Sequence, residues 1–291
     1  MKQKQRGSDR HKTKVKVTLK AKEIEIKNKI IKLGPIIEAI RSTLESSPTE
    51  VSEMTGIPMD SRDIELNIFD SEGYRLANEK RGRWNKETPY STGIFDHEYK
   101  DISIDSESLI RAIYSEDKDG IEYHSRLGLI RCTWHELIHL YIYEYKPESV
   151  EWCEIKKSCK KMSNSLLRDI RCWMHYLIKT PKRNMKELIS EGIAYWGEDY
   201  LVESHFGNEY RRLQRGENTN PSENGIFLEL SLPKKLMILL KDKTLLGYWF
   251  VEEIFKLIKS NPIKLIIDNM PKSYIELLYP ERYLKRLKNN E

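Results

Sequence analysis

The chain has 291 residues, of which 39% are hydrophobic and 33% are charged. This length and balance suit one large folded domain or two closely packed ones. The net charge of +5 is a small excess of 50 Lys and Arg over 45 Asp and Glu. No apolar stretch reaches the length of a membrane span, and the first residues lead into no signal-peptide core. We therefore expect a cytoplasmic protein without membrane contact.

The first segment of the chain is strongly basic. Residues 1–22 hold many Lys and Arg side chains, and Asp9 is their acidic member. Such a run is usually solvated, and we expect residues 1–12 to form a flexible tail. Contact with nucleic acid is the alternative for this tail. The chain shows no helix-turn-helix signature, RNA-binding aromatic motif or zinc finger, so nucleic acid is not the expected partner.

Alternating apolar and polar residues predict several short strands before residue 106. The predicted strands are 14–21, 23–27 and 63–69, and residues 92–105 predict a strand, a turn and a second strand. Residues 28–33 favour a hairpin return after the second strand. Gly34-Pro35 opens a helix that is predicted to end near Ser46. We therefore expect residues 13–105 to form a mixed α/β layer.

Helical periodicity dominates the chain after Asp105. The predicted helices are 106–114, 122–145, 163–179, 186–202, 233–240 and 245–260. Residues 215–225 are rich in Gly, Asn and Pro and predict a loop. Together these patterns favour an α+β fold class. A mixed N-terminal sheet is expected to pack on the helix at 122–145, and a mainly helical C-terminal half is expected over residues 106–291.

The helix at 122–145 contains the motif His-Glu-x-x-His at residues 135–139. Residues four apart lie on one face of an α-helix, so His135 and His139 can point their imidazole rings at one ion. Glu136 lies about 100° further round the helix, close enough to hold a water bound to that ion. Neutral imidazoles suit Zn²⁺, but a catalytic zinc site needs a further protein ligand. The motif alone is also compatible with a half-exposed helix that carries two ordinary histidines.

A second motif, Glu-Gly-Ile-Ala-Tyr, occupies residues 191–195. A His-Glu-x-x-His helix followed by a helix with Glu-Gly-x-Ala-aromatic resembles the gluzincin metallopeptidases, particularly the Peptidase MA-like group. The resemblance implies that Glu191 is the third zinc ligand, beside His135 and His139. The Gly and Ala of the motif lack bulk where two helices must approach closely. The alternative is a surface glutamate on an amphipathic helix. Softer likenesses to the same group extend over residues 93–283.

The resemblance implies a zinc-dependent metallopeptidase that binds one catalytic Zn²⁺ and acts on a peptide or protein substrate. Glu136 would be the general base for a zinc-activated water. The chain has no Gly-x-Met-Glu-Asn aminopeptidase signature, so an endopeptidase is expected. Two other classes stay open. One is a catalytically inactive or regulatory relative that binds zinc or a peptide, and the other is a nucleic-acid-associated protein that uses its basic N-terminus.

Further site residues are expected from their positions relative to the two motifs. Glu198 or Asp199 would orient a zinc-bound histidine. Ile94 and Phe95 lie in a segment that resembles the gluzincin edge strand, which pairs with the substrate backbone. A plain hairpin without a ligand is the equal alternative for this segment. A hydrogen-bond donor to the reaction's oxyanion is also expected. Tyr248 is the expected donor, and Tyr195 and His205 are its rivals.

Other metal-binding arrangements can be compared with the sequence. A metzincin would need Gly at position 142 and His at position 145, and the chain has Ile142 and Tyr145, which excludes that class. The chain has 4 cysteines, a number that fits a reducing compartment. A second, structural zinc site stays open, although its spacing matches no common zinc finger. Its candidate ligands are Cys153, Cys159, Cys172 and His175.

Overall fold

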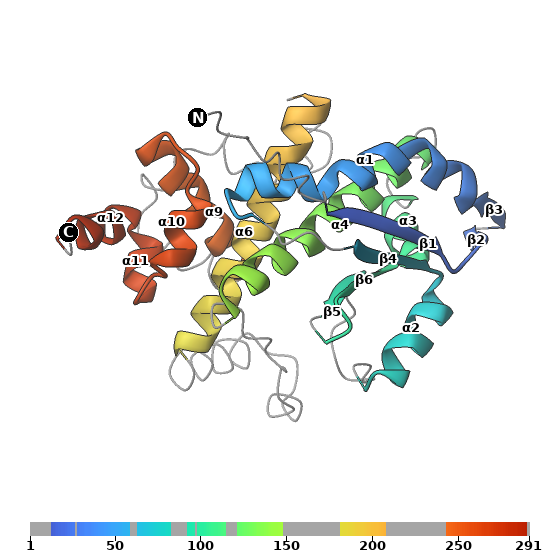
Figure 1. The fold of residues 1–291 in the computed structure, drawn as a ribbon, viewed down its shortest axis with the longest axis horizontal. Helices are drawn as coiled ribbons and strands as arrows, with labels where there is room; N and C mark the ends of the chain where they lie inside the picture. Colours follow the sequence, from blue (N-terminus) through green and yellow to red (C-terminus); the bar gives the residue numbers. More distant parts are fainter. Residues whose placement is uncertain are drawn as a thin grey trace, which may run out of the picture.

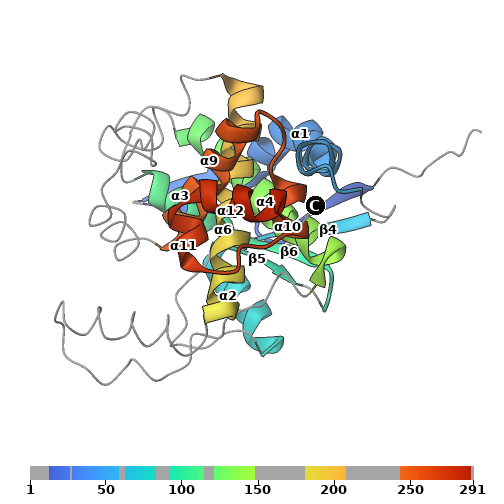
Figure 2. The same cartoon turned by 90° about the vertical axis from the view of Figure 1, so that its left-hand side faces the viewer.

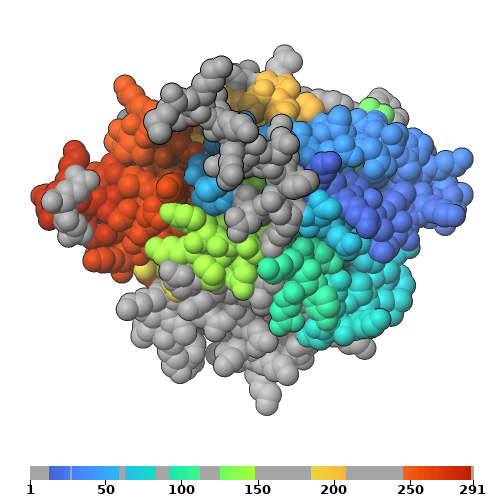
Figure 3. All heavy atoms as spheres, in the orientation of Figure 1, coloured from blue at the N-terminus to red at the C-terminus, as the bar shows by residue number. Residues whose placement is uncertain are grey.

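The computed structural model has a small sheet at the N-terminal end and helices through most of the remainder (Figure 1). It describes residues 13–26, 28–58, 63–82, 92–96, 98–114, 121–147, 181–207 and 243–289. Several predictions fall outside these residues: the tail at 1–12, the helices at 163–179 and 233–240, the loop at 215–225, and Cys153, Cys159, Cys172 and His175. In the space-filling view the first described segments (blue) and the last ones (orange to red) occupy opposite ends of the molecule (Figure 3).

Four strands form the main sheet, in the order β1-β4-β6-β5. They span Lys14–Leu19 (β1), Asp63–Phe69 (β4), Gly93–Asp96 (β5) and Asp101–Asp105 (β6). β1, β4 and β6 run parallel, whereas β5 is antiparallel to β6 and forms one edge. Every residue of β6 is buried, as expected for an inner strand covered on both faces. The mixed sheet and its predicted strands are confirmed.

A separate hairpin follows β1. Its strands are β2, Glu23–Ile26, and β3, Lys29–Lys32, and they pair in antiparallel register. Asn28 stands in the turn with a φ of 64°, in the left-handed region that asparagine tolerates better than most residues. The apolar side of the hairpin forms a small second core with neighbouring residues. The predicted hairpin return is therefore confirmed.

Helix α1, Leu33–Thr55, is longer than the sequence predicts. The predicted end near Ser46 is wrong, because the helix continues through Pro48. Proline removes a backbone donor and normally weakens a helix. Two tertiary contacts offset this loss: Val51 is fully buried on the apolar face, and the hydroxyl of Tyr141 donates to the carbonyl of Pro48. Packing therefore decides the length of this helix more than local propensity does.

Helix α2, Ser71–Lys80, is absent from the predictions made from the sequence. Asp70 caps it by accepting a hydrogen bond of 2.7 Å from the amide of Gly73. Among its residues, Tyr74 and Asn78 are the buried ones. Such a polar helix has too short an apolar stripe to give a recognisable helical period. Capping and ion pairs, rather than an apolar face, define it.

The helical part confirms the helices predicted at 106–114, 122–145, 186–202 and 245–260. Their observed bounds, with three short helices at the C-terminal end, are α3 (Ser106–Tyr114), α4 (Ile121–Tyr145), α6 (Pro181–Phe206), α9 (Lys243–Ile258), α10 (Ile263–Asp268), α11 (Tyr274–Leu278) and α12 (Pro280–Lys288). No helix in the described part of the chain is long and apolar enough to cross a membrane.

Helix α4 lies at the centre of the molecule. It packs against α1, α3 and α6 and against the strands β5 and β6. Viewed from the C-terminal end, α10 and α12 lie in front of α4 (Figure 2). Apolar residues are buried around the whole circumference of α4, as in a helix that is enclosed by protein. Polar side chains on such a helix must find partners inside the protein, because burial without partners is unfavourable.

Helices α6 and α9 meet at a pair of glycines. A Cβ atom added to Gly192 would lie 2.2 Å from the carbonyl carbon of Gly247. One added to Gly247 would lie 1.9 Å from the carbonyl oxygen of Leu188. On the side of α6 that faces α4, a Cβ on Gly197 would lie 2.7 Å from the side chain of Ile138. Small residues thus allow α6 to lie tightly between α4 and α9.

Replacing Gly247 by alanine is expected to destabilise the protein by about 1–3 kcal/mol, because the added methyl group overpacks the helix crossing. Gly34→Ala is the control, since its added Cβ meets nothing within 4 Å. This control is expected to be neutral or slightly stabilising. Urea denaturation followed by circular dichroism measures the free energy of unfolding of both variants. Wild-type stability of Gly247→Ala would contradict the close approach of α6 and α9.

Candidate metal centre

Helix α4 places the side chains of His135 and His139 next to each other. Their Nε2 atoms are 3.1 Å apart, and their ring centroids are 4.8 Å apart. His139 is buried and His135 is partly buried, so both rings lie within the protein. The spacing of one helical turn therefore brings the two imidazoles together as the sequence predicts.

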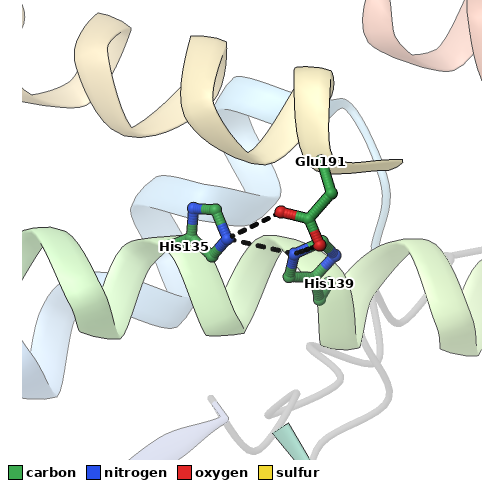
Figure 4. A group of neighbouring side chains, drawn as sticks. All are labelled: His135, His139 and Glu191. Atoms are coloured by element: carbon green, nitrogen blue, oxygen red, sulfur yellow. Dashed lines mark hydrogen bonds and ion pairs between the residues drawn. The ribbon is translucent and has the colours of Figure 1, made fainter. Parts of the chain in front are cut away.

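Glu191 reaches this pair from the facing helix α6 (Figure 4). Its carboxylate oxygens lie 3.4 Å from Nε2 of His135 and 3.5 Å from Nε2 of His139. One ligand-type atom from each residue can be chosen so that all three lie within 4.8 Å of one another. Ligands bound at about 2.0–2.1 Å to a tetrahedral ion are separated from each other by roughly 3.3–3.4 Å. The three residues could therefore hold a metal ion.

The ring nitrogens that face away from the cluster also have partners. Nδ1 of His135 lies 3.3 Å from Oε2 of Glu198. Nδ1 of His139 lies 3.0 Å from the hydroxyl of Ser190. Partners of this kind fix the orientation and tautomer of a metal-binding histidine. Both partners lie on α6, so the helix that carries Glu191 also orients the two imidazoles.

The structure distinguishes between the two predicted orienting residues. Glu198 contacts His135, whereas Asp199 contacts Arg131 at 3.1 Å. Glu198 lies two helical turns after Glu191, on the same face of α6, which directs both side chains at α4. Burial raises the pKa of Glu198, but the charge of Arg131 and the contacts with His135 outweigh burial and lower it.

Ser190 is a site residue that the sequence predictions missed. The one signal for it is its position directly before Glu191, at the border of the helix face that meets α4. A serine in a helix gives no motif of its own, and its hydroxyl commonly bonds to the backbone or to solvent. Its contact with His139 follows from the relative placement of two helices that are distant in sequence.

Burial and neighbouring charges act in opposite directions on the cluster. Burial raises the pKa of Glu191, but the charges and hydrogen bonds of His139 and His135 outweigh it and hold that pKa well below its ordinary value. Burial lowers the pKa of His135, but its contacts with Glu191 and Glu198 hold that pKa well above its ordinary value. The carboxylates therefore stabilise positive charge at this position, which is the electrostatic requirement for a cation site.

Glu136 is buried beside the three candidate ligands. Its Oε2 accepts a hydrogen bond of 2.7 Å from the amide of Phe95 on β5. Burial raises the pKa of the Glu136 carboxyl, although the neighbouring imidazoles and this hydrogen bond oppose the shift. β5 can approach this closely because residue 93 is glycine. A Cβ on Gly93 would lie 2.6 Å from Sγ of Cys132 and 2.8 Å from Oε1 of Glu136.

Successive residues of the edge strand β5 direct their backbone groups alternately toward β6 and away from it. The amide of Asp105 donates to the carbonyl of Thr92 at 2.8 Å, so Thr92 faces β6. In an antiparallel pair the backbone groups of successive residues face alternate sides. The backbone of Gly93 and Phe95 therefore faces away from β6, and the amide of Phe95 reaches the site. The predicted substrate-binding residues Ile94 and Phe95 thus lie on the strand that borders the site.

A cavity of about 340 Å³ opens beside His135 and Glu136. This volume is within the range of small-ligand sites. Both side chains therefore border a space that can admit a small ligand or part of a larger one. The described residues that line it are Thr92, Gly93, Leu109, Gly128, Arg131, Cys132, His135, Glu136, Tyr195 and Glu198.

The three predicted oxyanion donors lie in different places. Tyr195 lines the cavity, and its ring centroid is 4.7 Å from that of His135. Tyr248 is buried on α9 and is not among the described residues that line the cavity. His205 lies near the C-terminal end of α6, with Nε2 at 3.3 Å from Glu50. The structure therefore brings Tyr195 to the cluster and places His205 elsewhere.

A buried ion-pair network holds the end of β5. Asp96 on β5 and Asp101 on β6 stand opposite each other and are both buried. Arg81 contacts Asp96 at 3.2 Å and Asp101 at 2.8 Å. Asn67 adds a hydrogen bond of 3.1 Å to Asp101. Opposed carboxylates destabilise a strand pair unless a cation lies between them, so Arg81 keeps β5 against β6 and beside Glu136.

Comparison of the chain with models of known protein families, with curated proteins and with solved structures found no match. The sequence and the structure together define a mixed α/β protein with a mainly helical C-terminal part. Within it, two histidines and a glutamate from two facing helices form a group that could hold a metal ion.

Replacing Arg81 by alanine is expected to destabilise the protein by about 3–5 kcal/mol, because two buried carboxylates lose their shared cation. Arg75→Ala is the matched control, since it removes ion pairs with Glu72 and Glu79 on the surface of α2. Solvent screens these exposed pairs, so the control should change stability much less. Urea unfolding of both variants measures the difference. If both variants lose equally little free energy of unfolding, the buried network does not hold β5.

Proposed function

We propose that the protein is a zinc-dependent metallopeptidase of the gluzincin type, acting as an endopeptidase. The observation that carries this proposal is the cluster of His135, His139 and Glu191. The two Nε2 atoms are 3.1 Å apart, and the carboxylate oxygens lie 3.4 and 3.5 Å from them. The resemblance of both motifs to gluzincins supports the assignment of reaction class.

Zinc is the ion that this donor set fits best. Two imidazole nitrogens and one carboxylate make the His₂Glu set that recurs in catalytic zinc sites. Mg²⁺ and Ca²⁺ prefer sets made of oxygen donors. The partners Glu198 and Ser190 at both Nδ1 atoms also fit histidines that bind through Nε2. When bound, Zn²⁺ supplies a Lewis acid that lowers the pKa of water and polarises a carbonyl group.

Glu136 is proposed as the general base. It is buried, it lines the cavity, and it lies next to both candidate histidine ligands. Burial raises the pKa of its carboxyl, which brings the proton affinity of this group closer to that needed near neutral pH. Its carboxylate would accept a proton from the attacking water and deliver it to the leaving amine. The amide of Phe95 orients this carboxylate through its hydrogen bond.

β5 is proposed as the strand along which the substrate lies. The backbone of Gly93 and Phe95 faces away from β6, and Gly93 lines the cavity. An extended peptide can add to such an edge through main-chain hydrogen bonds. Recognition of this kind requires no free peptide terminus, which supports an endopeptidase.

Tyr195 is proposed as the donor to the oxyanion, in preference to Tyr248 and His205. Its side chain is partly exposed and lines the cavity beside His135. A donor must lie close to the position where negative charge develops in the reaction. Of the three candidates, Tyr195 has the placement that supports this role.

Purified protein is expected to contain about one zinc ion per chain, as elemental analysis would measure. Replacing both His135 and Glu191 by alanine should abolish zinc binding, because two of the three ligands are removed. His205→Ala is the matched control, since this histidine lies near the C-terminal end of α6, away from Glu191. The zinc content of this variant should be unchanged. Zinc retained by the double variant would contradict the ligand assignment.

Wild-type protein is expected to cleave members of a mixed peptide library, with the products identified by mass spectrometry. Glu136→Gln should lower turnover by at least about 10²-fold with zinc retained, because acid–base catalysis typically contributes about 10²–10⁴-fold. Glu144→Gln, at an exposed position of the same helix, is the control and should keep wild-type turnover. If the zinc-loaded wild type cleaves no peptide, the proposed peptidase activity is wrong, and the protein is instead a non-catalytic zinc-binding or peptide-binding protein.

A further inference from the structure

Arg131 lies on the same helix as His135 and lines the same cavity. The two residues are one helical turn apart on α4, so their side chains lie on one face. One guanidinium nitrogen, Nη2, is 2.5 Å from Oε1 of Glu198 and 3.1 Å from Oδ1 of Asp199. The side chain of Arg131 is 18% exposed, and those of Glu198 and Asp199 are 7% and 4% exposed. The arginine is therefore the cation between two neighbouring buried carboxylates.

The two oxygens of Glu198 have different partners. Oε1 receives the hydrogen bond from Arg131, and Oε2 lies 3.3 Å from Nδ1 of His135. A carboxylate fixed at one oxygen has little freedom to rotate the other oxygen away. The contact between Arg131 and Glu198 thus determines where His135 finds the acceptor for its Nδ1 proton. That acceptor in turn sets the direction of Nε2, which points at His139 and Glu191.

We propose that Arg131 is a positioning residue for the metal site, which holds Glu198 so that His135 presents Nε2 to the metal ion. This role goes beyond the ligands and the general base, and it rests on the metal site of the proposed function. An arginine suits the role because its planar guanidinium presents several donors in a fixed geometry. Without Arg131, two adjacent buried carboxylates would repel each other, and Glu198 would lose the partner that fixes its orientation.

The test measures binding of Zn²⁺ alone to the full chain, by competition with a chromogenic chelator. Arg131→Gln removes the charge, and it is expected to weaken Zn²⁺ binding by about 10–100-fold, the usual effect of losing a group that supports a ligand. Arg131→Lys keeps the charge without the planar geometry and should recover part of the affinity. Arg41→Gln is the matched control, because it removes an exposed arginine that pairs with Glu38 on α1. This control should bind Zn²⁺ like wild type.

A double-mutant cycle separates positioning from a general effect on stability. If Arg131 acts through Glu198, Arg131→Gln should have little further effect in a Glu198→Gln background. Visible spectra of the Co²⁺-loaded proteins supply a second readout, because they respond to the geometry of the ligands. An altered spectrum is expected for Arg131→Gln and not for Arg41→Gln. If Arg131→Gln fails to fold, the same cycle is measured with Arg131→Lys.

Each outcome supports or overturns the proposal. Wild-type Zn²⁺ affinity in folded Arg131→Gln, or additive effects of the two substitutions, would overturn it. A loss that disappears in the Glu198→Gln background would support it. Failure of the proposed function looks different, because the wild-type chain would then bind no zinc or cleave no peptide. If the wild type binds zinc and the Arg131 variants bind it equally well, only the proposed role of Arg131 is overturned, and the proposed function stands.

Discussion

The structure depends on the compensation of buried charge between α4 and α6. α4 buries apolar residues around its whole circumference, yet it carries His135, Glu136 and His139. Buried polar groups of this kind are tolerated where partners are held at hydrogen-bond distance. α6 supplies partners for the two histidines, β5 supplies one for Glu136, and the glycines of α6 and α9 allow the helices to approach closely enough. The fold and the candidate site therefore share one requirement, which is the exact pairing of two helices.

The sheet contributes mainly by fixing one strand. β5 is a short edge strand, and its ordering relies on contacts at both ends: Gly93 lies against α4, and Asp96 is held through Arg81. These contacts place the backbone of β5 next to Glu136 on α4 rather than leaving it as an ordinary hairpin. A small sheet can thus border a cavity whose other walls are helical, because one strand is anchored from two directions.

Local chemistry explains which features the sequence could predict. The pairing of His135 with His139 follows from helical spacing alone, whereas Glu191 is expected beside them because the second motif resembles that of gluzincins. The contacts of Ser190 and Tyr195 depend on how α6 sits against α4, which no local pattern encodes. The same reason accounts for α1, whose continuation through Pro48 depends on tertiary contacts, and for α2, whose polar sequence lacks an apolar period.

The length of β5 has a consequence for the behaviour of the chain in solution. Open sheet edges invite pairing between molecules, and natural proteins limit this by keeping such edges short or by engaging their backbone groups. β5 spans only Gly93–Asp96, and the outward amide of Phe95 is already bonded to Glu136. The backbone of only two residues of this strand, Gly93 and Phe95, faces away from β6, which is enough to contact a short extended peptide but too little to hold the strand of another copy. The edge can therefore border a cavity without promoting self-association into extended β-structure.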